Sequence, residues 1–218
     1  MSKITKVKAR QIFDSRGNPT IEAEVFAKNQ SAIAICPSGA STGTYEAFEK
    51  RDKNNKKYLG KSVLKAVELV NSKISKKLKG QNVHNQERID ALLINLDGTR
   101  QKTNLGANAM LAVSMAVKKL SAKVKKLPLY KTFFLKNNFQ LPYPLMNIIN
   151  GGAHANNGLR IQEFMIRPDR AKSFSEAMRI CFVVIKNLSN LIKNKGYSTS
   201  VGDEGGFAPM ISSNNQAL

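Results

Sequence analysis

The sequence predicts an α+β domain followed by βα units that carry a carboxylate-bearing site. Three observations lead to this fold class. Strand patterns gather in the first 36 residues, helix patterns fill residues 61–135, and strand and helix patterns alternate after residue 142. Strands followed by a run of helices are typical of α+β domains, whereas alternation is typical of α/β folds.

Length and composition limit the class of protein. The 218 residues suffice for one large or two modest domains, and the polar segment 136–142, which ends in proline, is the best boundary between them. We therefore expect domains at residues 1–138 and 139–218. No apolar run approaches the roughly 18 residues of a membrane span, and the N-terminus lacks the apolar core of a secretory signal. Two cysteines without metal-ligand spacing favour a reduced, cytoplasmic setting.

The formal net charge of +20 raises the question of nucleic-acid binding. Of the 35 basic residues 26 are lysine, and they are spread over every helix-like segment, without tryptophan or an RNA-binding aromatic signature. Solvated lysine-rich faces explain this composition, and a dedicated nucleic-acid surface is the alternative. In either case the positive field would attract small anionic substrates.

The first domain begins with three predicted strands, at residues 3–13, 20–27 and 32–36. Residues 21–25 alternate apolar and charged side chains, as in a sheet with one solvated face. A hairpin turn at 28–30 joins the second and third strands, so the three strands form an antiparallel meander. The seven residues 37–43 that follow are small or turn-forming. Such a loop lets its backbone approach a ligand closely, although a plain surface loop has the same composition.

Helix patterns come next in the chain. Apolar residues three or four apart predict an amphipathic helix over 61–79. A shorter helix is expected at 86–95, and a central one at 106–126, because 107–117 is apolar nearly all round. We expect a short fourth helix at 128–135.

The start of the second domain holds the strongest indication of a site. Two short apolar runs, 145–149 and 164–166, predict buried strands at 144–150 and 161–167, separated by a loop rich in glycine and asparagine. His154, Gln162 and Glu163 lie between the two runs. Because burying a carboxylate is costly unless it is paired, hydrogen-bonded or metal-bound, these side chains indicate a functional site.

A long helix follows the second of these strands. Ser173 and Glu176 form a capping box that opens a helix over 174–195. A brief strand is expected at 197–201, and the last residues, 212–218, look like the start of another helix.

Two more acids lie in the glycine-rich turn 202–209. Asp203 and Glu204 come just past a predicted strand, where α/β barrels keep their active sites, although solvated acids in an ordinary turn are the alternative. Glu204 and Glu163, on different strand ends, are candidates to share proton transfer. His154 and the small-residue loop are candidates to close over a ligand. No substrate follows from the residues alone.

At these residues the chain resembles the enolase family. The matching segments, in the family's order and approximate spacing, are DSRGNPT (14–20), PSGASTG (37–43), GANA (106–109), MNIINGG (146–152) with His154, QEFMI (162–166) and VGDEGG (201–206). The resemblance covers the chain from Lys3 to Pro209. The resemblance implies an α+β N-terminal domain, with a three-stranded antiparallel meander plus helices, followed by the first, incomplete part of an α/β (TIM-type) barrel.

The resemblance also implies a reaction, the reversible dehydration of 2-phospho-D-glycerate to phosphoenolpyruvate in glycolysis and gluconeogenesis. In that family a Lys removes the C2 proton, two Mg²⁺ ions stabilise the dianion, and a Glu protonates the leaving 3-hydroxyl. Glu204 matches that catalytic acid, and Glu163 matches a second carboxylate beside the leaving hydroxyl. Gln162 matches a substrate-binding amide, His154 matches the His of a loop that closes on substrate, and Ser41 matches the loop serine that ligates the second Mg²⁺. A homodimer is implied as well.

The chain departs from the family in its length. Enolase chains are longer, and the remainder completes the barrel and carries the base Lys and the three carboxylates of the first Mg²⁺ site. We therefore expect residues 1–218 to be inactive alone, with uncovered apolar faces that favour association or disorder after about residue 140. Three hypotheses follow: an enolase fragment, one half of a split enzyme, or a degraded basic protein that binds RNA or another partner, RNA-processing partners included.

Overall fold

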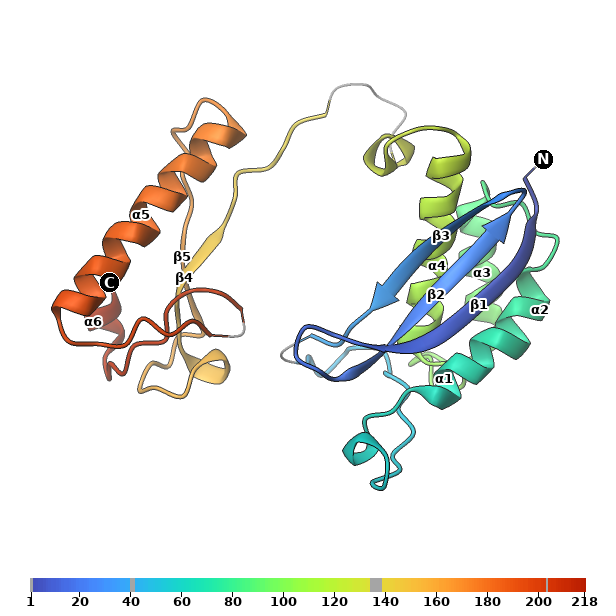
Figure 1. The fold of residues 1–218 in the computed structure, drawn as a ribbon, viewed down its shortest axis with the longest axis horizontal. Helices are drawn as coiled ribbons and strands as arrows, with labels where there is room; N and C mark the ends of the chain where they lie inside the picture. The colour runs from blue at the N-terminus through green and yellow to red at the C-terminus, as the bar shows by residue number, and fades with distance from the viewer. Residues whose placement is uncertain (1, 40–41, 134–138, 203) are drawn as a thin grey trace. The chain divides into compact units, whose positions relative to one another are not determined.

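The computed structural model describes every residue except 1, 40–41, 134–138 and 203 (Figure 1). The chain divides into two compact units, Met1–Asn137 (unit 1) and Asn138–Leu218 (unit 2). Each unit has its own hydrophobic cluster, large in unit 1 and small in unit 2.

Unit 1 begins with a three-stranded antiparallel sheet. Its strands lie in the order β1 (Ile4–Phe13), β2 (Pro19–Ala27) and β3 (Gln30–Cys36), which confirms the expected meander. Alternate residues of β2, from Ile21 to Val25, are buried on one face. On the other face Glu22 and Glu24 pair with Arg10 of β1. The alternation of apolar and charged residues thus produces one core face and one polar face.

The helix expected over 61–79 is shorter than predicted and contains a π turn. It consists of α1 (Leu64–Leu69), η2 (Val70–Ile74) and α2 (Ser75–Leu78) end to end. Residues 61–63 stay outside because Asp52 caps the start of the helix. The Asp52 carboxylate accepts hydrogen bonds from the backbone N–H groups of Leu64 (3.0 Å) and Lys65 (2.9 Å). A cap supplied by an upstream loop satisfies the free N–H groups of the first turn, but periodicity within the helix does not reveal it.

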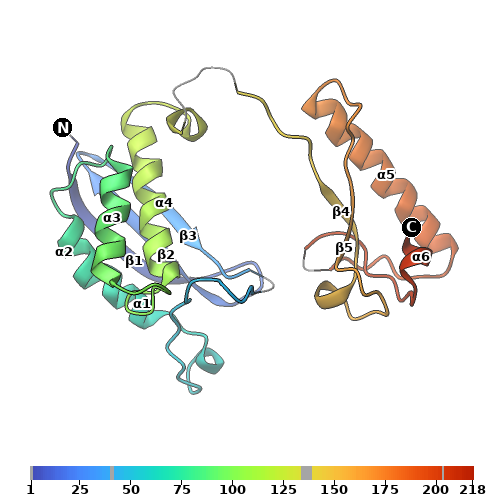
Figure 2. The ribbon, with the colours of Figure 1, turned by 180° about the vertical axis from the view of Figure 1, so that it is seen from behind.

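The helices α3 (Gln86–Asp97) and α4 (Ala107–Val124) agree with the prediction to within two residues at each end. Helix α4 packs on β2 and β3, and Figure 2 shows α3 and α4 in front of the sheet. The buried face of α4 includes Ala109, Val113 and Leu120. The core of unit 1 therefore lies between one face of the sheet and the helices.

Of the short fourth helix expected at 128–135, the described residues show only a 3₁₀ helix. They form one 3₁₀ turn, η3 (Leu129–Thr132), and residues 134–135 lie outside the described part of the chain. Lys118 of α4 donates from Nζ to the carbonyl oxygen of Thr132 (2.9 Å) and stacks over the Phe133 ring. A side chain from α4 thus satisfies a carbonyl group at the end of the turn.

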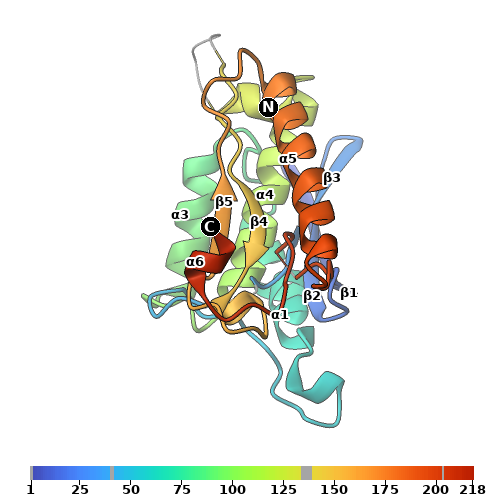
Figure 3. The same ribbon diagram turned by 90° about the vertical axis from the view of Figure 1, so that its left-hand side faces the viewer.

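Unit 2 is built on an antiparallel hairpin. Its elements are β4 (Met146–Asn150), β5 (Glu163–Ile166), α5 (Phe174–Asn194) and the one-turn α6 (Asn214–Ala217). Because β4 and β5 are antiparallel, simple βα repetition does not describe this pair. Figure 3 shows α5 running beside the hairpin, and Leu188 of α5 packs against a small cluster that includes Ile149 and Ile211. The Oγ atom of Ser173 accepts from the N–H of Glu176 (3.1 Å), which confirms the predicted cap.

The apolar runs of the hairpin are less buried than expected. Leu145 is 62% exposed and Met165 is 50% exposed, whereas Ile149 is buried. A two-stranded hairpin with one helix beside it leaves alternate side chains uncovered. The apolar composition of these runs therefore does not predict which of their side chains are buried within unit 2.

The strand expected at 197–201 is also wrong. Within the described residues it is reduced to a single bridge between Val201 and Phe207. A serine hydroxyl competes for its backbone, because the N–H of Ser200 donates to Ser198 Oγ (3.1 Å). Local side-chain bonds of this kind weaken a strand.

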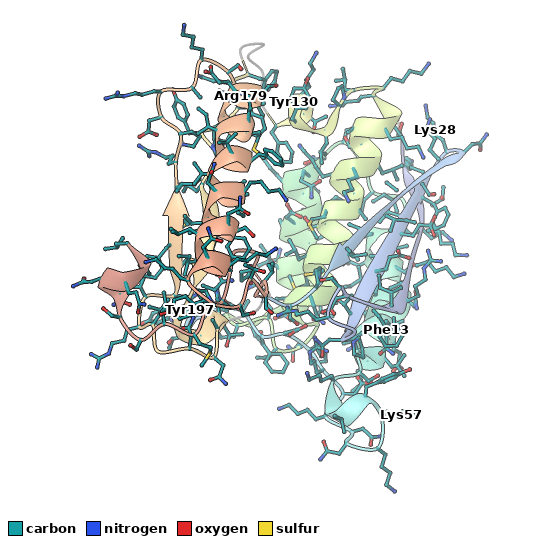
Figure 4. The ribbon with its side chains drawn as sticks, turned by 60° about the vertical axis from the view of Figure 1, so that its left-hand side comes forward. Phe13, Lys28, Lys57, Tyr130, Arg179 and Tyr197 are labelled. Carbon is teal, nitrogen blue, oxygen red and sulfur yellow. The ribbon has the colours of Figure 1, made fainter. Side chains whose placement is uncertain are left out.

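Charged side chains project from separate elements of unit 1. Figure 4 places Lys28 at the tip of the β2–β3 hairpin and Lys57 on the segment just before η1 (Tyr58–Gly60). Both lysines are exposed.

In the part of the chain that the structure describes, no helix has both the length and the apolar character needed to cross a membrane.

Candidate active site

His154, Gln162 and Glu163 meet at the end of the β4–β5 hairpin. Gln162 Nε2 lies 2.9 Å from His154 Nε2, and on the other side of the ring His154 Nδ1 lies 3.2 Å from Glu163 Oε1. The His154 side chain is 6% exposed, whereas the Glu163 side chain is 29% exposed. The imidazole is therefore held between an amide and a carboxylate that remains open to solvent.

The roles of the ring nitrogens depend on the tautomer of His154. Gln162 Nε2 can only donate, so the tautomer that accepts at His154 Nε2 has its proton on Nδ1. Nδ1 then faces the Glu163 carboxylate, although the contact lacks hydrogen-bond geometry and the buried Nδ1 has no hydrogen-bond partner among the described residues. In that tautomer the ring proton lies next to the Glu163 carboxylate, which suits proton transfer at this carboxylate.

The hairpin sets this geometry. Asn150, the last residue of β4, lies opposite Glu163, the first residue of β5. The chain leaves β4 through Gly151, where an added Cβ would collide with the carbonyl oxygen of Ile161. The next turn, η4 (Gly152–His154), then brings the imidazole back beside β5. Glycine at 151 is required for this close return of the backbone.

Glu204 lies in a tight turn. The N–H of Gly202 donates to the carbonyl oxygen of Gly206 (3.1 Å), and the N–H of Gly205 donates to that of Gly202 (3.1 Å), so the turn closes on itself. Gly205 and Gly206 have φ angles of +73° and +72°, which glycine adopts at little cost. Glu204 is exposed on this turn, and Asp203 lies outside the described residues.

The turn of Glu204 touches the loop of His154. A Cβ added to Gly202 would lie 3.1 Å from the carbonyl oxygen of His154. The structure thus brings His154 into contact with both Gln162 and Glu163, and the backbone of the turn that carries Glu204 lies against the loop of His154. An imidazole and carboxyl groups are suited to proton transfer, and an amide is suited to hydrogen-bonding a substrate.

Sequence reasoning missed two asparagines. The Asn150 side chain is fully buried at the end of an apolar strand, and its Nδ2 donates to the carbonyl oxygens of Gly205 and Gly206 in the acidic turn. Asn157 Nδ2 donates to the carbonyl oxygens of Asn150 (3.0 Å) and Pro209 (3.1 Å). An amide within a buried strand was the available signal, since a buried polar group needs a partner. The sequence does not indicate, however, which group the buried amide binds.

The small-residue loop is anchored in unit 1. Arg16 Nη2 donates to the carbonyl oxygen of Ser38 (2.6 Å), and Ser38 Oγ lies 2.7 and 2.8 Å from the two carboxylate oxygens of Glu49. Arg51 Nη2 donates to Ser38 Oγ and to Glu49 Oε1, both at 2.8 Å. We call these four residues the loop anchor. Ser41, the expected Mg²⁺ ligand, lies outside the described residues.

Two further features concern metal binding and thiol chemistry. Within residues 2–39, 42–133, 139–202 and 204–218, no group of three or more His, Cys, Asp or Glu side chains is placed to hold a metal ion. Burial raises the pKa of the Cys36 thiol, and the charge of Glu49 raises it further, so this thiol stays protonated at neutral pH.

Known proteins match the chain over both units. Residues 4–133 match the family model described as enolase, N-terminal domain, and residues 138–218 match the one described as enolase, C-terminal TIM barrel domain. The enolase of Pelagibacter ubique (strain HTCC1062) is 82% identical over 218 residues, which are 100% of this chain and 52% of that protein. The chain thus spans about half the length of this curated relative. The predicted order, an α+β domain and then the first part of a TIM-type barrel, is confirmed, and the chain belongs to the enolase family.

Proposed function

We propose that this chain supplies the acid side of the dehydration of 2-phospho-D-glycerate to phosphoenolpyruvate. Residues 1–138 and 139–218 are its two domains in this proposal. Membership of the family supports carbon–oxygen hydro-lyase chemistry with a metal cofactor in general. The contact of His154 with both Gln162 and Glu163 is the observation that carries the assignment of the acid side.

In the proposed reaction the C3–O bond of the substrate breaks and its electron pair goes to oxygen. That oxygen takes the proton of Glu204 and leaves as water. Glu163, oriented by His154, is the second carboxylate beside the leaving hydroxyl, and the Gln162 amide contacts the substrate. We place the Lys that removes the C2 proton outside residues 1–218.

Mg²⁺ is the proposed metal, with Ser41 as one ligand. No step of the reaction is assigned to the ion. A role in glycolysis and gluconeogenesis, a cytoplasmic location and a homodimer belong to the same proposal, because the family resemblance implies them. Neither the family descriptions nor the name of the relative mentions RNA, so RNA-processing partners are not part of it.

The test is a phosphoenolpyruvate assay with Mg²⁺ on the purified 218-residue chain, alone and mixed with the remaining half of the Pelagibacter enolase. We expect no turnover by the chain alone and measurable turnover by the mixture. Glu204→Gln should lower the rate of the mixture by roughly 10²–10⁴-fold, because it removes the acid. Glu68→Gln, at an exposed position of α1, is the matched control and should leave the rate unchanged.

Two results would contradict the proposal. Turnover by the chain alone would show that the base lies within residues 1–218. A mixture that is as active with Glu204→Gln as without it would remove Glu204 from the role of acid.

A further inference from the structure

We propose that Asn150 is a positioning residue that holds the turn of Glu204 against the strand end that carries Glu163. The inference rests on the proposed function, because it matters only if the two carboxylates act on one substrate. Nothing in the resemblance to enolases assigned Asn150 a role.

The Asn150 amide is used at both ends. Its Nδ2 donates to the carbonyl oxygen of Gly205 and, at 3.2 Å, to that of Gly206. Its Oδ1 accepts from Asn147 Nδ2. Because the side chain is fully buried, each lost bond leaves a polar group without water to replace its partner. An aspartate has no donor for the two carbonyl groups, so the carboxamide is the group that fits.

The backbone of Asn150 joins the same two segments. Its N–H donates to the carbonyl oxygen of Phe207 (2.8 Å), and the N–H of Phe207 donates to that of Ile148 (2.8 Å). In the β4–β5 register, Asn150 is the partner of Glu163. One residue therefore contacts the turn of one proposed acid and pairs with the other acid.

Gly202 makes room for this contact. A Cβ on Gly202 would collide with Asn150 Nδ2, so only glycine lets the amide reach the turn. The Glu204 carboxylate makes no hydrogen bond or ion pair with a described residue. Its position therefore depends on the backbone of the turn, which Asn150 holds.

The experiment uses the 218-residue chain with Asn150→Leu, which removes the amide at nearly the same size and adds no charge. Hydrogen exchange is measured at the amides of Gly202, Gly205 and Phe207, and nuclear magnetic resonance records the side-chain carboxyl signal of Glu204 during a pH titration. We expect hydrogen exchange at the three amides to become about tenfold faster or more, while exchange at the α5 amides stays unchanged. We also expect the chemical shift of the Glu204 side-chain carboxyl group to change.

A stability control separates positioning from general support of the fold. Ile192→Ala removes a buried side chain of the same unit, so it should lower stability without changing the Glu204 signal. Gly202→Ala displaces the turn while Asn150 stays intact, so it should reproduce the effects of Asn150→Leu.

Each remaining outcome overturns the inference. It fails if Asn150→Leu leaves the turn amides and the Glu204 signal as in the unaltered chain, or if Ile192→Ala shifts that signal equally. It also fails if both Asn150→Leu and Gly202→Ala unfold unit 2, because Asn150 would then be a folding residue. Turn amides that exchange in the unaltered chain as fast as in an unstructured peptide would overturn it too. None of these measurements needs turnover, so failure of the phosphoenolpyruvate assay is a separate result.

Discussion

The buried carboxylate of Asp97 offers a quantitative test of how unit 1 is held together. Asp97 is 2% exposed and accepts hydrogen bonds from the N–H groups of Leu105 (2.7 Å) and Thr99 (3.0 Å), and from the Thr99 hydroxyl. It thereby ties the end of α3 to the loop that leads into α4. The perturbation is Asp97→Asn.

The expected loss of stability follows from these contacts. The asparagine keeps one oxygen for Thr99 but turns an N–H group toward the N–H of Leu105, so one bond to a charged acceptor is lost and a buried donor is left unpaired. Such a change costs about 3 kcal/mol. With a urea dependence of about 1.5 kcal/mol/M for a domain of this size, the unfolding midpoint of unit 1 should fall by about 2 M.

The pH dependence has a defined sign. Burial opposes ionisation of Asp97, but hydrogen bonds from Thr99 and Leu105, together with the charge of Lys102, hold its pKa below the usual value. A carboxyl group with a lower pKa in the folded state stabilises that state fully above its unfolded pKa of about 3.9, and this stabilisation is lost as the pH falls through the folded pKa. The difference in the free energy of unfolding between the unaltered chain and Asp97→Asn should therefore be at its full size at pH 7 and become smaller below about pH 4.

The assay is a urea titration read by hydrogen exchange in peptides from the sheet and α4, so that the signal comes from unit 1 alone. Glu68→Gln removes an exposed carboxylate from α1 and should change stability by less than about 0.5 kcal/mol. A midpoint for Asp97→Asn within about 0.3 M of the unaltered chain at pH 7 would refute the reasoning. So would a gap that stays constant down to about pH 3.

Three further predictions concern other contacts. Ser173→Ala removes the cap of α5 and should lower local stability by about 1 kcal/mol, which hydrogen exchange in the first helical turn would show as a faster rate. Ser173→Asp should restore the slower exchange, and equal exchange in all three chains would disprove the cap. Phe182 is 58% exposed on α5, so Phe182→Glu should reduce self-association in sedimentation, whereas Asn190→Glu on the same helix should not; equal effects would show that charge alone is responsible. Arg51→Lys loses the paired contacts of the loop anchor and should speed exchange at the amides of Ser38 and Gly39, an effect that Arg88→Lys, at an exposed position of α3, should not share.

Elements with a local physical cause were predictable from the sequence. The alternation in β2 places its apolar side chains on one face, and Ser173 caps α5 from the adjacent position. Elements that depend on distant partners were not. The start of α1 is decided by Asp52, and the short turn η3 is held by Lys118 of another helix. Periodicity carries no information about such contacts.

The candidate site divides in the same way. His154, Gln162 and Glu163 were recognisable because these polar groups lie between two apolar runs, and burial of such groups demands partners. Asn150 was not recognisable, because its partners are carbonyl groups more than fifty residues further along the chain. Since every residue has a backbone carbonyl group, the sequence does not indicate which of them accept these hydrogen bonds.

By itself, then, the amino-acid sequence determined the sheet, the main helices, the enolase resemblance and the residue types of the site. The tertiary structure alone decided that His154 lies between Gln162 and Glu163, and that a buried amide holds the turn of Glu204. The reason is physical: propensity, periodicity and capping act over a few residues, whereas hydrogen bonds between distant segments exist only after the chain has folded.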